Sequence, residues 1–258
     1  MIEILTPAQL DRARITGRLV GDILQTLKER CRLGTNLLEI DRWAEQMIRA
    51  EGASSCYVDY APSFGSGPFG HYICTAVNDA VLHGMPRDLA LADGDLLTLD
   101  LAIIKDGIAA DAAISFIVGA TKAPEDVAMI DATERALAAA IDIAQPGARL
   151  GDLSHAIGTT LHAAGYQVNM EFGGHGIGST MHQDPHVAND GRPGRGYRLR
   201  PGLLLAIEPW VMADTDRLIT DQEDGWTLRS ATGGRTAHTE HTIAITAEGA
   251  EILTLPSR

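Results

Sequence analysis

Four acidic side chains of this 258-residue chain lie in or at the ends of apolar, strand-like segments, where acids are uncommon. They are Asp100, Asp111, Glu208 and Glu240. Buried beside one another, such carboxylates would repel and some would stay protonated. Divalent cations remove that repulsion, so acids that converge from several strands indicate a metal site. A strand-end glutamate alone is usually only a solvated terminus, and the interpretation depends on the whole set.

A glycine-rich segment supplies a nitrogen ligand for the same site. His175 lies in the run 172–178, which contains four glycines, and His182 follows seven positions later. Glycines let a backbone pass close to a neighbouring group and hold the histidine in a fixed direction. One imidazole and four carboxylates offer about seven or eight donor atoms, enough for two oxygen-preferring divalent ions. Taken alone, the segment could equally be a glycine-rich turn with a core histidine.

One hairpin places two of the acids side by side. Asp106-Gly107 is a typical two-residue hairpin turn, and it pairs Ala102 with Asp111. Asp100 and Asp111 then become diagonal neighbours on one face, with Cα atoms ~7–8 Å apart. That separation suits two cations ~3.5–4 Å apart. The alternative is a solvent-facing pair of aspartates, which the apolar flanks of both strands disfavour.

The elements that position these residues occur twice in the same order. Helices are predicted over residues 7–30, 34–52, 124–145 and 151–165, and a loop is predicted over 62–70. In both halves a glycine, Gly34 or Gly147, is followed five residues later by an acid and an aliphatic residue. This faint repeat predicts an α+β fold with two helix-helix-sheet halves, about 1–120 and 121–258, related by a pseudo-twofold. Chance similarity between two helix starts is the alternative.

Composition limits the classes of protein to consider. At 27.5 kDa with 45% hydrophobic residues, the chain can fill a sizeable core, and no linker interrupts a single domain over 1–258. The net charge of −13 opposes direct binding of nucleic acid or an anionic membrane. The three cysteines are an odd number without framework spacing, which indicates a reducing compartment. Without a signal-peptide pattern or a run of ~18 apolar residues, we expect a soluble, cytoplasmic monomer.

At this point the motifs resemble the type I methionine aminopeptidases of bacteria, a family with the pita-bread metallopeptidase fold, from about residue 7 to the end. The matching segments are Leu99-Asp100-Leu101, Asp111, Gly174-His175-Gly176-Ile177-Gly178, Ile207-Glu208-Pro209 and Glu240-His241-Thr242. The resemblance implies helices that cover a curved antiparallel sheet. It also implies that Asp100, Asp111, His175, Glu208 and Glu240 hold two divalent ions, which could be Co, Mn, Fe or Zn.

The resemblance further implies a reaction, the removal of the initiator methionine from nascent chains, near the ribosome, when the second residue is small. Glu208 would carry the proton of the attacking water to the leaving amine. His83 and His182 would contact the substrate backbone at the scissile amide. The methionine pocket would contain Trp226 and Cys74, and we place Phe69 and Met181 in it as well.

Several departures from the family pattern lie around the substrate. Gly70-His71-Tyr72 replaces a Pro-Lys-Ser run, Asp79 replaces a glutamate, and Met181 stands where an aromatic residue is common. Ala102 and Ala112 stand where hydroxyl side chains often support the two aspartates, so metal affinity could be weaker. Two alternatives remain: a proline-directed relative such as an X-Pro aminopeptidase, and a pita-bread binding module without catalysis. The first usually carries an extra N-terminal domain, and the second usually lacks some ligands.

Overall fold

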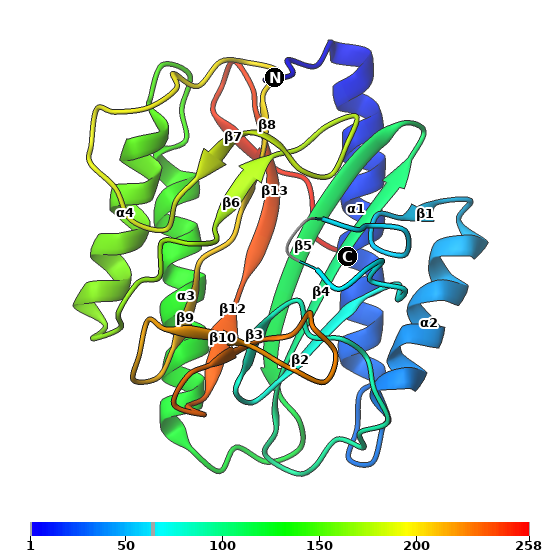
Figure 1. Ribbon diagram of the computed structural model, residues 1–258. Helices are drawn as coiled ribbons and strands as arrows, with labels where there is room; N and C mark the ends of the chain where they lie inside the picture. Colours follow the sequence, from blue (N-terminus) through cyan, green and yellow to red (C-terminus); the bar gives the residue numbers. More distant parts are fainter. Residues whose placement is uncertain (1, 63–64, 258) are drawn as a thin grey trace.

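The computed structural model describes residues 2–62 and 65–257, and its centre is a curved antiparallel sheet (Figure 1). The strands of this sheet are β1 (Ser54–Ser55), β2 (Cys74–Val77), β4 (Leu96–Lys105), β5 (Ile108–Ile117), β6 (Gly174–Gly176), β7 (Gln183–Val187), β8 (Leu204–Ile207), β13 (Glu240–Ile245) and β14 (Ala250–Ile252). Their order is β1-β4-β5-β13-β8-β6-β7, with β2 beside β4 and β14 beside β13. The β5–β13 pairing joins the two halves of the chain.

The remaining strands form two smaller sheets. The first has the order β10-β11-β3 and the second pairs β12 with β9; their bounds are β3 (Ala80–Leu82), β9 (Trp210–Met212), β10 (Leu218–Thr220), β11 (Leu228–Ser230) and β12 (Thr236–His238). All of the recorded strand pairs in the described residues are antiparallel. The predicted loop 62–70 contains no helix or strand in its described part, and residues 63–64 lie outside the described residues.

In the part of the chain that the structure describes, four helices cover the large sheet, two on each half (Figure 1). They are α1 (Pro7–Arg30), α2 (Leu37–Ala50), α3 (Pro124–Ile143) and α4 (Leu150–Ala163). Helices α1 and α2 pack against the half of the sheet that contains β4 and β5. Helices α3 and α4 pack against the half that contains β8 and β6. The predicted α+β arrangement of helices over a curved antiparallel sheet is therefore confirmed. Among the described residues, no helix is both long and apolar enough to cross a bilayer.

The first helix begins where the sequence predicts. Thr6 is its N-cap, Pro7 occupies the first position, and Gln9 closes the capping box. The second helix begins later than predicted, at Leu37, because the side chain of Asn36 accepts the Leu38 N–H at 2.9 Å and forms the cap. The residues before it form a turn, so the prediction of a start at 34–35 was wrong by two to three residues.

The faint repeat between the halves corresponds to a shared turn and cap. Gly34 has φ +84° and Gly147 has φ +93°, a conformation in which glycine lacks the steric penalty of other residues. Three residues into the following helices, Glu39 and Asp152 each accept the backbone N–H of the cap residue, at 3.2 and 2.8 Å. The same local chemistry thus starts α2 and α4.

Each half has its own apolar core between the helices and the sheet. In the first half, Leu99 and Leu101 of β4 pack with Ile23 and Leu24 of α1. Each fully buried side chain of this kind contributes about 1.5–3 kcal/mol. Since neighbouring strand residues face opposite sides, burying these leucines against the helices turns Asp100 to the sheet face away from them.

Candidate metal centre and substrate pocket

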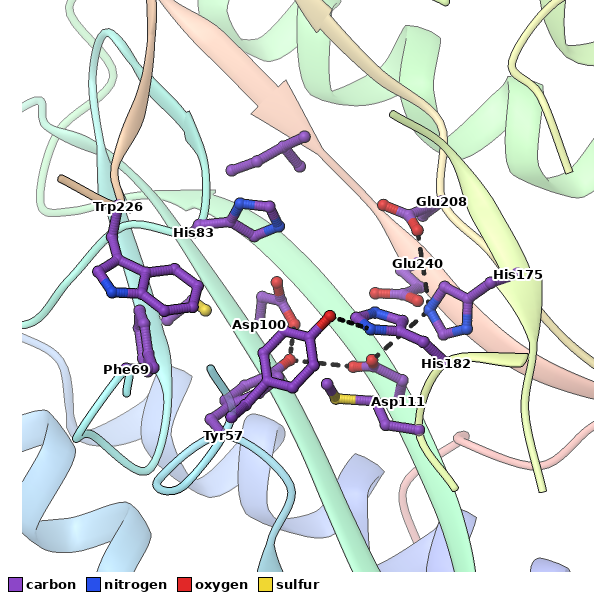
Figure 2. A pocket seen from close by; sticks show the side chains of 14 residues that line it. Tyr57, Phe69, His83, Asp100, Asp111, His175, His182, Glu208, Trp226 and Glu240 are labelled. Atoms are coloured by element: carbon purple, nitrogen blue, oxygen red, sulfur yellow. Dashed lines mark hydrogen bonds and ion pairs between the residues drawn. The ribbon is translucent and has the colours of Figure 1, made fainter. Parts of the chain in front are cut away.

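The five predicted ligands project from one face of the large sheet (Figure 2). Directly paired residues in neighbouring antiparallel strands share a face, as do residues two apart in one strand. The pairings that relate the five are Asp100↔Ala113, Ala113↔Glu240, Thr242↔Ala206 and Ala206↔His175, with Asp111 two residues before Ala113 and Glu208 two residues after Ala206. The small alanines between them leave room for the longer side chains.

The β4–β5 hairpin has the predicted register. Asp106 and Gly107 form its two-residue turn with φ values of 50° and 76°, and Ala102 pairs with Asp111. Asp100 pairs with Ala113, as that register requires. The diagonal arrangement of the two aspartates is thereby confirmed.

The acids and His175 lie within a few ångströms of one another. Ligand atoms of Asp111, His175 and Glu240 are all within 4.8 Å. Nε2 of His175 is 3.9 Å from Asp111 Oδ2 and 3.9 Å from Glu208 Oε1. Asp100 joins the group through the hydroxyl of Tyr57, which is 2.5 Å from Asp100 Oδ1 and 3.3 Å from Asp111 Oδ1.

The glycines around His175 fit β6 tightly between two other strands. A Cβ atom on Gly174 would lie 2.3 Å from the carbonyl oxygen of Ala206, and one on Gly176 would lie 2.1 Å from that of Asp184. The close approach predicted from the glycines is thus to neighbouring backbone. Nδ1 of His175 is 3.0 Å from the Gly176 carbonyl, so Nδ1 carries the proton and Nε2 presents a lone pair to the acids.

Burial at this site disfavours side chains that carry an unneutralised charge. It raises the pKa of Asp100 to about 6 and that of Glu208 to about 8, where the charge of Asp100 adds to the effect. The pKa values of Asp111 and Glu240 are raised by burial and by the neighbouring carboxylates, whereas burial lowers the pKa of His175 to about 3. In metal-free protein at neutral pH, Glu208, Asp111 and Glu240 therefore tend to hold protons, whereas Asp100 is mostly ionised and the imidazole is neutral.

This donor set fits divalent cations. Oε1 of Glu240 is buried and has no hydrogen-bond partner among the described residues. In the described part of the chain, no lysine or arginine lines the pocket that contains the acids. Converging carboxylate oxygens and one imidazole lone pair, with no balancing protein cation, are what hard or borderline divalent ions require.

The acids form the floor of a pocket with an aromatic wall (Figure 2). Phe69 and Trp226 meet edge to face with ring centroids 5.2 Å apart, and Met181 and Cys74 are buried beside them. These are the four residues that we assigned to the methionine pocket, and the structure brings all of them together. Burial raises the pKa of the Cys74 thiol, which keeps it neutral and the wall largely apolar.

The two non-ligand histidines also line the pocket. His182 is exposed at its mouth, with its ring 4.4 Å from that of His175, and Tyr60 Oη lies 2.9 Å from its Nδ1. His83 follows β3 with φ 54°, an unusual conformation for a residue with a Cβ atom. Burial lowers the pKa of His83 to about 4, so its ring is neutral at pH 7.

Four residues of the site escaped the sequence interpretation. Tyr57, Tyr60 and Leu82 line the pocket, and His238 lies behind the acids. His238 is buried, with Nε2 3.7 Å from Glu208 Oε2 and 3.9 Å from Glu240 Oε2. The position of His238 two residues before Glu240 could have indicated that it lies near the acids. Nothing in the local sequence pattern marks the two tyrosines as pocket residues.

One departure from the family pattern has a structural explanation. Asp79 accepts a hydrogen bond from Arg229 Nη1 at 2.9 Å, and Nε of the same arginine donates to Asp221 at 2.8 Å. The shorter acid therefore binds a basic residue in β11 rather than facing the pocket.

Comparison with known proteins identifies the family. The model of metallopeptidase family M24 matches residues 11–247. A methionine aminopeptidase of Clostridium perfringens is 40% identical over 256 residues, which is 99% of each chain. Methionine aminopeptidase 1 of Mycobacterium tuberculosis is 40% identical over 254 residues, covering 96% of this chain and 92% of that protein.

Solved structures agree with this result. The crystal structure of a methionine aminopeptidase from Thermotoga maritima superposes with a TM-score of 0.93 at 34% identity, covering 99% of this chain and 100% of that one. A prolidase from Pyrococcus horikoshii reaches a TM-score of 0.76 at 19% identity, covering 99% of this chain and 64% of that one, and shows a shared fold only. The expected pita-bread fold is confirmed. The chain is a metallopeptidase and belongs to family M24.

Proposed function

We propose that this chain removes the N-terminal methionine from peptides and newly made proteins when the second residue is small. The observation that carries the proposal is the meeting of five ligand side chains with a sulfur- and aromatic-lined pocket in one cavity. Full-length relatives that carry the name methionine aminopeptidase support the same reaction.

We infer that two divalent ions, Co, Mn, Fe or Zn, bind at Asp100, Asp111, His175, Glu208 and Glu240. When bound, such ions supply Lewis acidity and lower the pKa of an attacking water towards ~7. Asp111 and Glu240 would supply carboxylate oxygens to both ions, and Asp100 would hold the second ion. The protonated Nδ1 of His175 leaves its Nε2 as a nitrogen ligand.

The remaining chemistry belongs to the side chains around the acids. Glu208 accepts the proton of the water and returns it to the leaving amine. His182 donates to the developing oxyanion, and His83 holds the amide nitrogen side of the scissile bond. Phe69, Cys74, Met181 and Trp226 receive the methionine side chain, because sulfur and ring edges pack favourably.

Hydrolysis of short peptides by the purified chain tests this function. With Mn(II) or Co(II), Met-Ala-Ser is cleaved and Met-Leu-Ser is spared, because a small second residue is required. Glu208→Gln is the matched control, since it keeps the size of the side chain but removes the proton acceptor, and its kcat falls by about 10²-fold or more. Equal turnover of X-Pro peptides would favour a proline-directed peptidase, and no turnover with any of the four metals a binding module.

We also propose the setting of the reaction. The partners are peptide N-termini of nascent chains, met near the ribosome in the cytoplasm, and the chain acts as a monomer. The net charge of −13 disfavours direct contact with nucleic acid.

A further inference from the structure

A tyrosine hydroxyl sits between the two aspartates of the candidate metal centre. Oη of Tyr57 is 2.5 Å from Asp100 Oδ1 and 3.3 Å from Asp111 Oδ1, and the tyrosine is buried (Figure 2). A hydrogen bond from a hydroxyl to an ionised carboxylate is short and about twice as strong as one between neutral groups. The geometry is therefore that of a donor directed at Asp100.

The backbone holds Tyr57 firmly against the strand that carries Asp100. Ser55 of β1 pairs with Ile103 of β4, and the Cys56 N–H donates to the Ala102 carbonyl at 3.0 Å. The Tyr57 N–H in turn donates to Ser55 Oγ at 3.0 Å. The hydroxyl and Asp100 are thus fixed to the same sheet.

The ring of Tyr57 occupies space that a small neighbour provides. It packs with Ala102 and Phe69 in one buried cluster, with its ring centroid 5.8 Å from that of Phe69. Ala102 lies two residues after Asp100 on the same face and offers no hydroxyl of its own. A phenol carries its proton at neutral pH and can therefore donate to a carboxylate.

We propose that Tyr57 is a positioning residue for the metal ligand Asp100, supplying from a separate loop a hydroxyl that the neighbouring Ala102 lacks. The inference rests on the proposed metal centre. By bonding one carboxylate oxygen, Tyr57 fixes the rotamer of Asp100 and leaves its other oxygen for the cation. Hydrogen-bond partners of metal ligands typically change metal affinity 10- to 100-fold when they are removed.

Titration of metal-free full-length protein with Mn(II) in a calorimeter tests the proposal. Tyr57→Phe keeps the ring and removes only the hydroxyl, so we expect one binding step to weaken by about 10- to 100-fold. Tyr197→Phe is the matched control, because this tyrosine lies in the other half and packs on the apolar core between β8 and the helices α3 and α4. Its affinities should equal those of the unaltered chain, and equal affinities for Tyr57→Phe would overturn the proposal.

A double-mutant cycle separates positioning from a general loss of structure. If Tyr57 acts through Asp100, adding Tyr57→Phe to Asp100→Asn changes the remaining Mn(II) affinity by less than about twofold. Additive losses would instead mean that the hydroxyl acts elsewhere. Thermal unfolding in EDTA checks that each variant is folded.

Steady-state kinetics give a second reading. At saturating Mn(II), Tyr57→Phe should regain most of its kcat with KM unchanged, whereas a raised KM would indicate a role in the methionine pocket and contradict the proposal. If the unaltered chain binds Mn(II) but cleaves no methionyl peptide, the proposed function fails while the titrations still decide the role of Tyr57.

Discussion

A hydrogen bond to His182 decides which of its ring nitrogens can serve the reaction. Oη of Tyr60 is 2.9 Å from Nδ1, and a phenol that donates there leaves the ring proton on Nε2. Only that tautomer makes Nε2 a donor for a developing oxyanion. This tautomer of His182 needs no rearrangement at the moment of reaction, because the hydrogen bond from Tyr60 already selects it in the folded protein.

We therefore predict that Tyr60→Phe lowers kcat by about tenfold, less than the ~10²–10³-fold loss on removing an oxyanion donor itself. The ¹⁵N shifts of His182 should move towards a mixture of tautomers. Tyr72→Phe is the control, because its hydroxyl accepts a bond from Arg49 instead. Unchanged ¹⁵N shifts in Tyr60→Phe would rule out this role.

At the scale of elements, one arginine ties the wall of the pocket to the strand that precedes His83. Arg229 of β11 lies opposite Ala80 of β3 and donates to both Asp79 and Asp221. Trp226 stands two residues before β11. Arg229 and Asp221 are largely buried and Asp79 is partly exposed, so removing the arginine leaves Asp221 as a poorly solvated carboxylate.

We expect Arg229→Met, which keeps an apolar stem, to lower the free energy of unfolding by about 1.5–3 kcal/mol. It should also raise the KM of methionyl peptides, since Trp226 and His83 lose a common anchor. Arg135→Met removes a solvent-exposed ion pair with Asp131 and should change stability by less than about 0.5 kcal/mol. Urea denaturation measures the free energy of unfolding and steady-state kinetics measure KM in both variants. Equal effects in the two variants would show that Arg229 does not anchor the pocket wall.

The elements also show what the sequence could and could not predict. The Asp106-Gly107 turn fixed the register of its hairpin because turn type and pairing are local. The caps of α1 and the glycine spacing around His175 were equally local signals. Tyr57 and Arg229 were beyond prediction, since their partners lie 43 and 150 residues away and alternation along one segment carries no information about another. Asn36 displaced the predicted start of α2 because it caps better than the glycine turn before it.

At the scale of the whole molecule, the site makes metal-free protein sensitive to alkaline pH. Burial raises the pKa of Glu208 from its ordinary 4.5 to about 8 and also raises those of Asp111 and Glu240. Between pH 4.5 and about 8, Glu208 holds more of its proton in the folded state than in the unfolded state. The free energy of unfolding that it contributes therefore falls as the pH rises. The buried histidines have lowered pKa values and act oppositely, but only below about pH 6.5, where the unfolded chain takes up their protons.

Between pH 7 and 8 the histidines become almost fully neutral in both states, so the acids dominate the pH dependence. We predict that Glu208 alone makes protein in EDTA lose about 1 kcal/mol of stability per pH unit between pH 7 and 8, one proton being worth about 1.4 kcal/mol per unit, and that Asp111 and Glu240 add to this loss. Saturating Mn(II) should abolish this loss, because bound cations replace the protons. Glu208→Gln should reduce it in EDTA, since an amide does not titrate and only Asp111 and Glu240 remain. Scanning calorimetry at half-unit steps measures all three profiles. A melting temperature in EDTA that holds steady from pH 7 to 8 would mean that these acids are already ionised without metal.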